Sequence, residues 1–272
     1  MSETPASYFT DDSMLRRVHR EWAVAFSGPR ALLLQATHPV AFEGFFAHTG
    51  ALDAPYERLS RTAKVMDEIA FGSREKADRM TRRVRAMHAR VSGELSEPAG
   101  RFPAGTPYRA DDPVLLLWIL ATLVDSALLV YQTYVRKLSR DERDAYCQDY
   151  KVIGRHFGLT DADMPDTVED FEAYFTGMLE SGDLYVSDEA RELAKQIVMH
   201  PPVPLVARPL LEVVNFITVG LLPKHVREMY DLGWDPARAV ALQAGAQYTK
   251  RLLLPFVPGR LRQVPQARSA VA

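Results

Sequence analysis

One long apolar run limits what this chain can fold into. Residues 114–135 read VLLLWILATLVDSALLVYQTYV, which is long enough for a helix to cross a lipid bilayer. Asp125 and Ser126, however, stand at the middle of the run. A carboxylate at that depth is costly in lipid but tolerable in a protein core that gives it a partner. The run therefore predicts a central buried helix, and we expect no membrane span.

The first third of the sequence is punctuated like helices joined by short turns. Capping residues, prolines and glycines predict helices over residues 12–26, from residue 31 with a bend or restart at Pro39, over 55–72 and over 73–93. Residues 94–110 hold several prolines and glycines and predict a loop that has room for a short hairpin.

Helix starts are clearer in the rest of the chain. Asp112 and Pro113 begin the central helix, and the sequence SRDE at residues 139–142 is a capping box whose helix Gly158 is placed to end. Further helices are expected over residues 167–182, 187–200, 210–222 and 235–254. Since no strong period-2 run appears, the sequence predicts an all-α fold with roughly nine to eleven helices.

Composition narrows the class of protein. The chain has 272 residues, of which 47% are hydrophobic, so residues 1–272 can form a single large helical domain. We expect residues 1–10 and 256–272 to be loose tails. The net charge of −2 gives no global field to hold nucleic acid or an anionic membrane. Cys147 is the sole cysteine and residues 1–14 do not resemble a secretory signal, so we expect a cytoplasmic protein.

Several enzyme classes lack their sequence motifs. The chain has no HExxH, no GxGxxG, no Walker lysine loop and no Gly-x-Ser-x-Gly, and no Glu-x-x-His pairs like those of di-iron bundles. What remains is polar residues set in apolar surroundings. Residues 31–50 hold Gln35, His38, Glu43 and His48 among Leu, Val and Phe. These polar side chains either form hydrogen bonds where two helices meet, with His38 bonding a carbonyl freed by Pro39, or line the wall of a pocket.

The next two helices each carry a candidate. Leu59, Thr62, Met66 and Ile69 share one face, with Arg58 one turn from Thr62; that arginine either reaches solvent or anchors a carboxylate such as a haem propionate. On the following helix one inward stripe is expected to hold Ala77, Met80, Val84, Met87, His88 and Val91. His88 either bonds a core group or ligates a metal, as the proximal histidine of a helical haem protein does.

Four segments in a fixed order resemble a known family. RALLLQATHPVAFEGFFAH, RLSRTAKVMDEIAFG, VRAMHARVSG and YRADDPVLLLWILATLVDS look like the oxygenase family that contains the latex clearing protein, a rubber oxygenase, and the endoplasmic-reticulum oxygenase of mycophenolic acid biosynthesis. The resemblance spans roughly residues 15–230. It implies a globin-like core, haem b in the rubber-cleaving members, dioxygen as co-substrate and oxidative cleavage of isoprenoid C=C bonds.

The resemblance also implies roles for individual residues. By position, His88 corresponds to the proximal iron ligand, and Arg58 and Thr62 to an arginine and a threonine near the haem. Arg61 stands where the rubber enzyme has a lysine over the distal face, and an arginine is a far poorer iron ligand. Glu43 lies one position away from the family's glutamate base. We do not expect this chain to share the export and polymer degradation of the rubber-cleaving enzymes. A small terpenoid, prenylated metabolite or lipid is therefore the favoured substrate.

Three hypotheses follow from the sequence. The first is a haem-dependent oxygenase in which His88 holds the iron, Glu43 or His38 moves protons, Arg58 binds a propionate, and the apolar lining comes from Phe42, Phe45, Phe46 and Trp118. The second is a non-haem iron oxygenase that uses His38, His88 and either Glu43 or Asp125. The third is a helical carrier of lipid or isoprenoid without catalytic activity. The involvement of an electron donor is left open.

Overall fold

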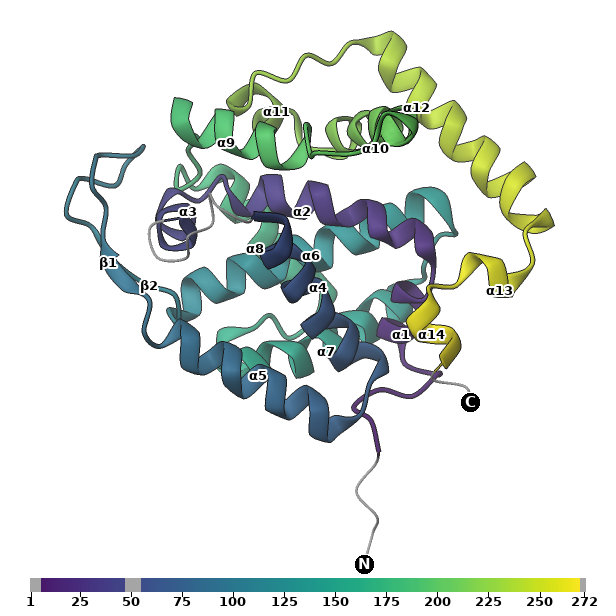
Figure 1. Ribbon diagram of the computed structural model, residues 1–272, viewed down its shortest axis with the longest axis horizontal. Helices are drawn as coiled ribbons and strands as arrows, with labels where there is room; N and C mark the ends of the chain where they lie inside the picture. Colours follow the sequence, from purple (N-terminus) through teal and green to yellow (C-terminus); the bar gives the residue numbers. More distant parts are fainter. Residues whose placement is uncertain (1–5, 47–54, 270–272) are drawn as a thin grey trace, which may run out of the picture.

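The computed structural model describes residues 6–46 and 55–269, with the backbone alone at residues 45, 46, 55–59 and 269. The all-α class is confirmed: the described residues form fourteen α-helices and one small two-stranded sheet (Figure 1). The count exceeds the roughly nine to eleven expected because short helices of six residues or fewer, which carry little periodic signal, add to it. These are α1 (Met14–His19), α11 (Lys224–Met229), α13 (Gly259–Arg262) and α14 (Pro265–Ser269).

The first part of the chain differs from the prediction at several helix ends, and the helix expected from residue 31 begins at Ser27 instead. After α1 come a 3₁₀ helix (Trp22–Phe26), α2 (Ser27–Gln35), α3 (Pro39–Phe46), α4 (Pro55–Phe71) and α5 (Arg74–His88). The single helix expected over residues 12–26 is broken at Arg20 and Glu21. There Glu21 forms an isolated bridge with Gln263, and the carbonyl of Arg20 accepts from the Val264 N–H at 2.8 Å. A contact with the far end of the chain therefore interrupts the helix.

A short hairpin, for which the predicted loop has room, is present and begins within the helix expected before it. Strands β1 (Ser92–Glu94) and β2 (Pro107–Arg109) pair antiparallel, with Gly93 opposite Tyr108. Because β1 begins at Ser92, the expected helix 73–93 ends at His88 instead. His88 is thus the last residue of α5, directly before the turn into the hairpin.

Helix α6 (Pro113–Tyr134) runs through the centre of the protein, and α2 packs along it (Figure 1). The Asp112 side chain caps it by accepting from the Val114 N–H at 2.8 Å, as the sequence predicts. By length and composition α6 could cross a membrane, but 56% of its most apolar window is buried inside the protein. The largest fully buried side chains include Trp118, Tyr146 and Tyr230.

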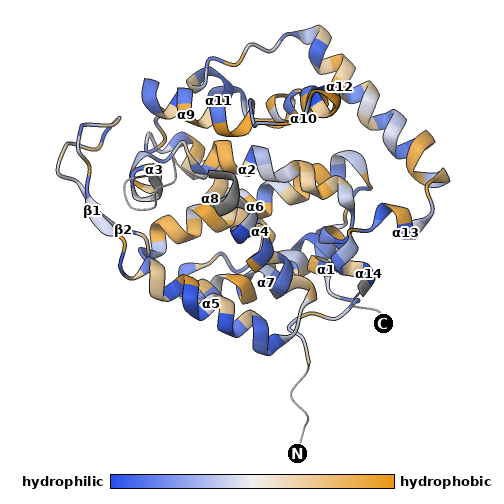
Figure 2. Cartoon of the chain, in the orientation of Figure 1, coloured by the Kyte–Doolittle hydropathy of each residue, from blue (hydrophilic) through white to orange (hydrophobic). Residues whose placement is uncertain are grey.

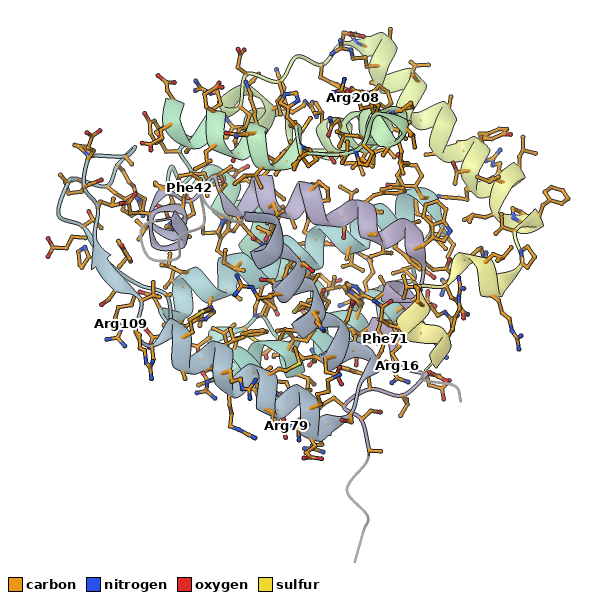
Figure 3. The ribbon with its side chains drawn as sticks, viewed as in Figure 1. Arg16, Phe42, Phe71, Arg79, Arg109 and Arg208 are labelled. Carbon is orange, nitrogen blue, oxygen red and sulfur yellow. The ribbon has the colours of Figure 1, made fainter. Side chains whose placement is uncertain are left out.

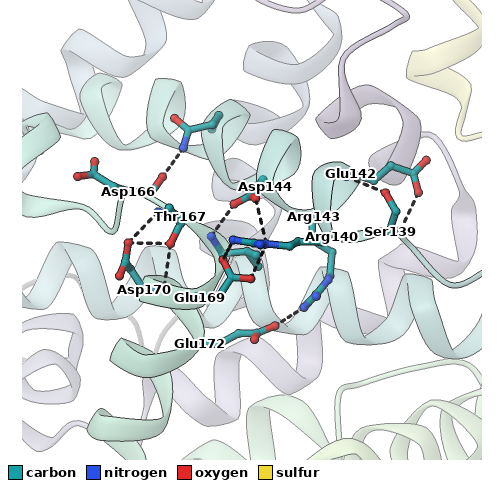
Figure 4. A network of polar contacts seen from close by, with 12 residues as sticks. Ser139, Arg140, Glu142, Arg143, Asp144, Asp166, Thr167, Glu169, Asp170 and Glu172 are labelled. Atoms are coloured by element: carbon teal, nitrogen blue, oxygen red, sulfur yellow. Dashed lines mark hydrogen bonds and ion pairs between the residues drawn. The ribbon is translucent and has the colours of Figure 1, made fainter.

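Helices α7 (Arg140–Phe157) and α8 (Val168–Glu180) are joined by the polar network of Figure 4. The capping box is confirmed, since Ser139 and Glu142 each accept from the backbone N–H of the other, and Gly158 ends α7 with φ of 110°. Between α7 and α8 lies a 3₁₀ turn (Asp161–Asp163), and Arg140 forms an ion pair with Glu169 at 2.7 Å. Local sequence chemistry is enough to predict these starts and stops.

Buried polar contacts join helices that are far apart in the sequence. The Arg16 guanidinium lies next to Phe71 in Figure 3, and its Nε donates to the Ala70 carbonyl at 2.9 Å, which fixes α1 to the end of α4. The Tyr230 hydroxyl donates to the Leu33 carbonyl at 2.8 Å, which fixes the segment after α11 to α2.

The C-terminal third covers one side of α2 and then runs along an edge of the molecule (Figure 1). It consists of α9 (Asp188–Val198), a 3₁₀ turn (Leu205–Ala207), α10 (Arg208–Leu221), α11, α12 (Pro236–Tyr248), a π-helical turn (Thr249–Leu253), a 3₁₀ turn (Leu254–Phe256), α13 and α14. The expectation of a loose tail from residue 256 needs correction for residues 259–269. They form α13 and α14 and contact Arg20, Glu21 and Asp67.

Candidate functional site

The carboxylate in the central helix has a cationic partner. Arg30, on α2, is only 3% exposed, and its Nη1 lies 2.6 Å from Oδ2 of Asp125. The same guanidinium donates to Ser126 Oγ at 2.7 Å and to the Leu221 carbonyl at 2.8 Å. Asp125 therefore has the charged partner within the protein that a carboxylate in an apolar helix requires. Its place in an ion pair argues against the metal-ligand role considered for it.

His38 is buried at the junction of α2 and α3. Its Nδ1 accepts from the Ala41 N–H at 3.5 Å, which caps the first turn of α3, and its ring lies 5.5 Å from that of Phe102. The expected partner, a carbonyl freed by Pro39, is therefore replaced by an N–H. Burial lowers the pKa of His38, so the ring is neutral at pH 7 with Nδ1 as the acceptor.

Glu43 lies on α3, half-buried, near the hairpin. Burial first, and then the negative charge of Glu43, raises the pKa of the Tyr108 phenol on β2. A Cβ on Gly44 would lie 3.4 Å from the Tyr108 ring, so α3 and β2 approach closely here. Phe42, one residue earlier and labelled in Figure 3, packs against the core. The side chains of Phe45 and Phe46 lie outside the described residues.

Helix α4 changes from exposed to buried along its length. Arg61 and Thr62 are exposed, Met66 is half-buried, and Ile69 is 1% exposed. The predicted apolar face is therefore covered by protein only towards the C-terminal end of the helix. The side chain of Arg58 lies outside the described residues, so its role stays a prediction.

His88 is half-buried rather than fully turned inward. Along the predicted inward stripe, burial decreases towards His88: Ala77 is 0% exposed, whereas Met87 is 46% exposed. The imidazole lies 6.5 Å from the Phe157 ring at an interplanar angle of 29°. The pKa of Asp111 is lowered first by the hydrogen bond from Arg109 and least by the charge of His88, which puts Asp111 within electrostatic range of the imidazole.

The predicted residues gather around one short stretch of chain. His88 lies near Asp111, Glu43 near Tyr108, and the pKa of His38 responds, after burial, to the charges of Asp183, Arg101 and Asp112. Residues 108–112, which lead from β2 into α6, are therefore their common neighbour. Over residues 6–46 and 55–269, no group of three or more His, Cys, Asp or Glu side chains is arranged to hold a metal ion. The ligand set of the non-haem hypothesis is not assembled there.

The predicted apolar lining is also only partly brought together. Trp118 is 0% exposed and stacks on Phe175 at 5.7 Å, which places it in the core. A cavity of about 30 Å³ lies elsewhere along α6, where apolar side chains of that helix meet Cys147 and Tyr150 of α7 and Phe171 of α8. It has room for about one water molecule rather than an organic ligand.

Sequence reasoning missed one buried polar cluster. His19, on α1, has its Nε2 2.9 Å from the Tyr146 hydroxyl and 3.0 Å from the Tyr150 hydroxyl. Burial lowers the pKa of His19 to about 4. Tyr146 and Tyr150 stand one helical turn apart on α7, a spacing that could have indicated a shared partner. Arg30 was missed too, although a carboxylate within an apolar helix requires a cation somewhere.

The donor set around His88 fits a haem better than a bare metal ion. One half-buried imidazole stands beside a phenyl ring, and the carboxylate of Asp111 lies within electrostatic range of it. Helix α4, which packs against α5, carries Arg61 and Thr62 on its exposed part. A guanidinium suits the propionates of a haem.

Comparisons with known proteins identify the family of this chain. Residues 16–251 match the family model described as the ER-bound oxygenase mpaB/B'/rubber oxygenase catalytic domain. An uncharacterised protein of Mycobacterium bovis and one of Mycobacterium tuberculosis are each 25% identical over 186 residues, which cover 68% of this chain and 69% of theirs. No solved structure matches, so the globin-like core implied by the resemblance stays a prediction.

Proposed function

Because the chain belongs to the family of the ER-bound oxygenase mpaB/B' and the rubber oxygenases, we propose that it is a haem-dependent oxygenase. Its substrate is an apolar, unsaturated small molecule of the isoprenoid, prenylated or lipid-like kind. The reaction is oxidative cleavage of a C=C bond. If both atoms of dioxygen enter the two carbonyl products, the reaction balances without an external electron donor.

The observation that carries the proposal is the setting of His88. An imidazole at the end of a helix, half-buried beside Phe157 and within electrostatic range of Asp111, has surroundings that suit a proximal haem ligand.

The residues of this chain have separate tasks in the proposal. Haem iron, when bound, supplies the binding and activation of dioxygen. His88 would hold the iron, with Phe157 packed near its ring. Arg58 would bind a propionate, while Arg61 and Thr62 would meet the cofactor from the exposed part of α4. Phe42 would contribute to the apolar wall that keeps water from the reacting bond.

Proton transfer is better assigned to Glu43 than to His38. The Nδ1 of His38 already accepts from the Ala41 N–H, and burial lowers the pKa of the ring, so taking up a proton there would break the cap of α3. Glu43 is half-buried, and none of the described contacts of α3 gives it a role in capping the helix. We therefore propose Glu43 as the general base.

Two other functions remain as alternatives. A non-haem iron oxygenase would need His38, His88 and a carboxylate to converge, and the ion pair of Asp125 with Arg30 leaves Glu43 as the available carboxylate. A helical carrier of lipid or isoprenoid would need neither metal nor haem.

We place the protein in the cytoplasm, with an apolar small molecule as its ligand and no nucleic-acid partner, as the sequence leads us to expect.

The test is an ultraviolet-visible spectrum together with iron analysis, on protein expressed with added haem. We expect a Soret band and one haem per chain in the parent protein, and a loss of most haem in His88→Ala. The matched control is His200→Ala, which removes an exposed histidine after α9 and should keep its haem.

Each outcome decides between the alternatives. Haem lost from His88→Ala and kept by His200→Ala supports the proposal and justifies a screen of unsaturated substrates. Stoichiometric iron without a Soret band favours the non-haem enzyme. Protein that holds neither iron nor haem, but from which lipid can be extracted, favours the carrier.

A further inference from the structure

Five residues spaced four apart form an exposed stripe on the C-terminal helical segment. The C-terminal stripe consists of Val240, Ala244, Tyr248, Leu252 and Phe256. Its four large members are 65%, 59%, 57% and 81% exposed in chain order, and Ala244 is exposed as well. Residues at i and i+4 lie on the same side of an α-helix, which aligns Val240, Ala244 and Tyr248 on α12. Leu252, in the π-helical turn, and Phe256, in the 3₁₀ turn, extend the exposed apolar surface beyond the helix.

The opposite side of this segment attaches it to the protein. Ala246 is 4% exposed and packs with Val130 and Ile217, and Leu242 lies against the same cluster. Leu254 is 4% exposed. Figure 1 shows the segment at the edge of the molecule, and Figure 2 shows hydrophobic residues along it. The stripe therefore faces away from the core that holds the segment in place.

The charge of this part of the chain is entirely positive. Residues 236–272 contain six of the 33 basic residues and none of the 35 acidic ones. Arg251 and Arg260 are exposed, and within the described residues neither has a carboxylate in ion-pair contact. Lys250 is turned inward, since its Nζ donates to the Gln132 carbonyl at 2.7 Å. The near-zero net charge of the whole chain conceals this local excess.

We propose that the C-terminal stripe and its flanking arginines form a surface that binds an anionic lipid bilayer. An apolar strip with cations beside it is the pattern of helices that lie in the membrane interface. Anionic headgroups complement Arg251 and Arg260, whereas a second copy of this chain would bring the same positive charges against them. Binding is peripheral, through the interface alone, and does not depend on the chemistry proposed at His88.

The experiment is co-sedimentation of the full chain with lipid vesicles. One set of vesicles is pure phosphatidylcholine and the other contains phosphatidylglycerol as well. Two double variants separate the contributions: Leu252→Ser with Phe256→Ser removes apolar area, and Arg251→Ser with Arg260→Ser removes charge. Matched controls are Val114→Ser, which removes a 62% exposed apolar residue at the start of α6, and Arg82→Ser with Arg83→Ser on α5.

We expect binding to the anionic vesicles that weakens as salt is added. The arginine double variant should bind about 25-fold more weakly, about fivefold for each charge, and the apolar double variant should lose at least as much. The controls should bind like the parent, and circular dichroism should show all variants folded. Equal binding to both kinds of vesicle, or equal binding by parent and variants, would overturn the proposal. A dimer seen by light scattering in the parent protein and lost in the apolar double variant would also overturn it, because the stripe would then join two copies of the chain.

Discussion

The centre of the protein and the rim formed by α4 and α5 treat polar residues in opposite ways. In the centre, the charge of Asp125 is paired with Arg30, and His19 contacts two tyrosine hydroxyls. At the rim, Arg61 and Thr62 are exposed, and His88 is half-buried at the end of its helix. In the centre these polar side chains contact other parts of the protein core, whereas at the rim they are also within reach of a ligand.

This difference separates residues that hold the fold from residues that are available for function. A buried polar group that loses its partner costs free energy at once, while an exposed one can change with little effect on stability. Substitutions in the centre should therefore report on unfolding, and substitutions at the rim should report on ligand binding. Each prediction below tests that division.

The largest effect is expected from breaking the central ion pair. Arg30→Met should lower the free energy of unfolding by about 3–5 kcal/mol, because the Asp125 side chain, only 25% exposed, loses its cation and Ser126 and Leu221 lose their buried donor. Urea unfolding followed by circular dichroism measures the loss. The double variant Arg30→Met with Asp125→Leu should recover part of it, and Arg79→Met on the exposed face of α5 should change stability by less than about 0.5 kcal/mol. A loss no larger in Arg30→Met than in Arg79→Met would refute the importance of the ion pair.

A somewhat smaller effect is expected from His19 at acidic pH. Its pKa is about 4 in the folded protein against a reference value of 6.5, so between these values the unfolded chain binds more protons and stability falls as the pH falls. The loss should reach about 3 kcal/mol by pH 4. Urea midpoints between pH 7 and pH 4 measure it. His19→Gln, which does not titrate in this range, should lose correspondingly less, and parallel pH profiles would count against the assignment.

The smallest stability effect is expected on α4, which belongs to both regions. Ile69→Val, at the buried end, should cost about 1 kcal/mol in unfolding free energy, whereas Thr62→Val, at the exposed end, should cost less than about 0.5 kcal/mol. Haem titration should give the opposite order, with weaker binding in Thr62→Val and parent-like binding in Ile69→Val. Weaker haem binding in both variants would mean that the two ends of α4 are not functionally distinct.

Local chemistry predicts much of the fold. The Ser139–Glu142 capping box, Gly158 at the end of α7 and the Asp112 cap of α6 all follow from neighbouring residues. The break at Arg20 and Glu21 does not, because its cause is a contact with Gln263 and Val264. The folded state of α13 and α14 escaped prediction for the same reason.

The candidate site is less predictable than the fold. Sequence identifies His88 by its place among apolar residues, but the end of α5 depends on the pairing of Ser92 with Arg109 across the hairpin. The N–H partner of His38 follows from where α3 begins, which the periodicity around Pro39 did not settle. The Arg30–Asp125 pair joins two helices that the sequence alone does not align.

The bridge between Glu21 and Gln263 also bears on the order in which the protein is made. A ribosome releases the N-terminal helices long before the residues that pair with them, so the turn after α1 cannot reach its final form until nearly all of the chain has emerged. Tyr230 and Leu33, which also join distant parts of the sequence, add to the delay. Nascent chains that stall before α13 should therefore carry an unfinished first turn, a natural point for chaperones or proteases to recognise.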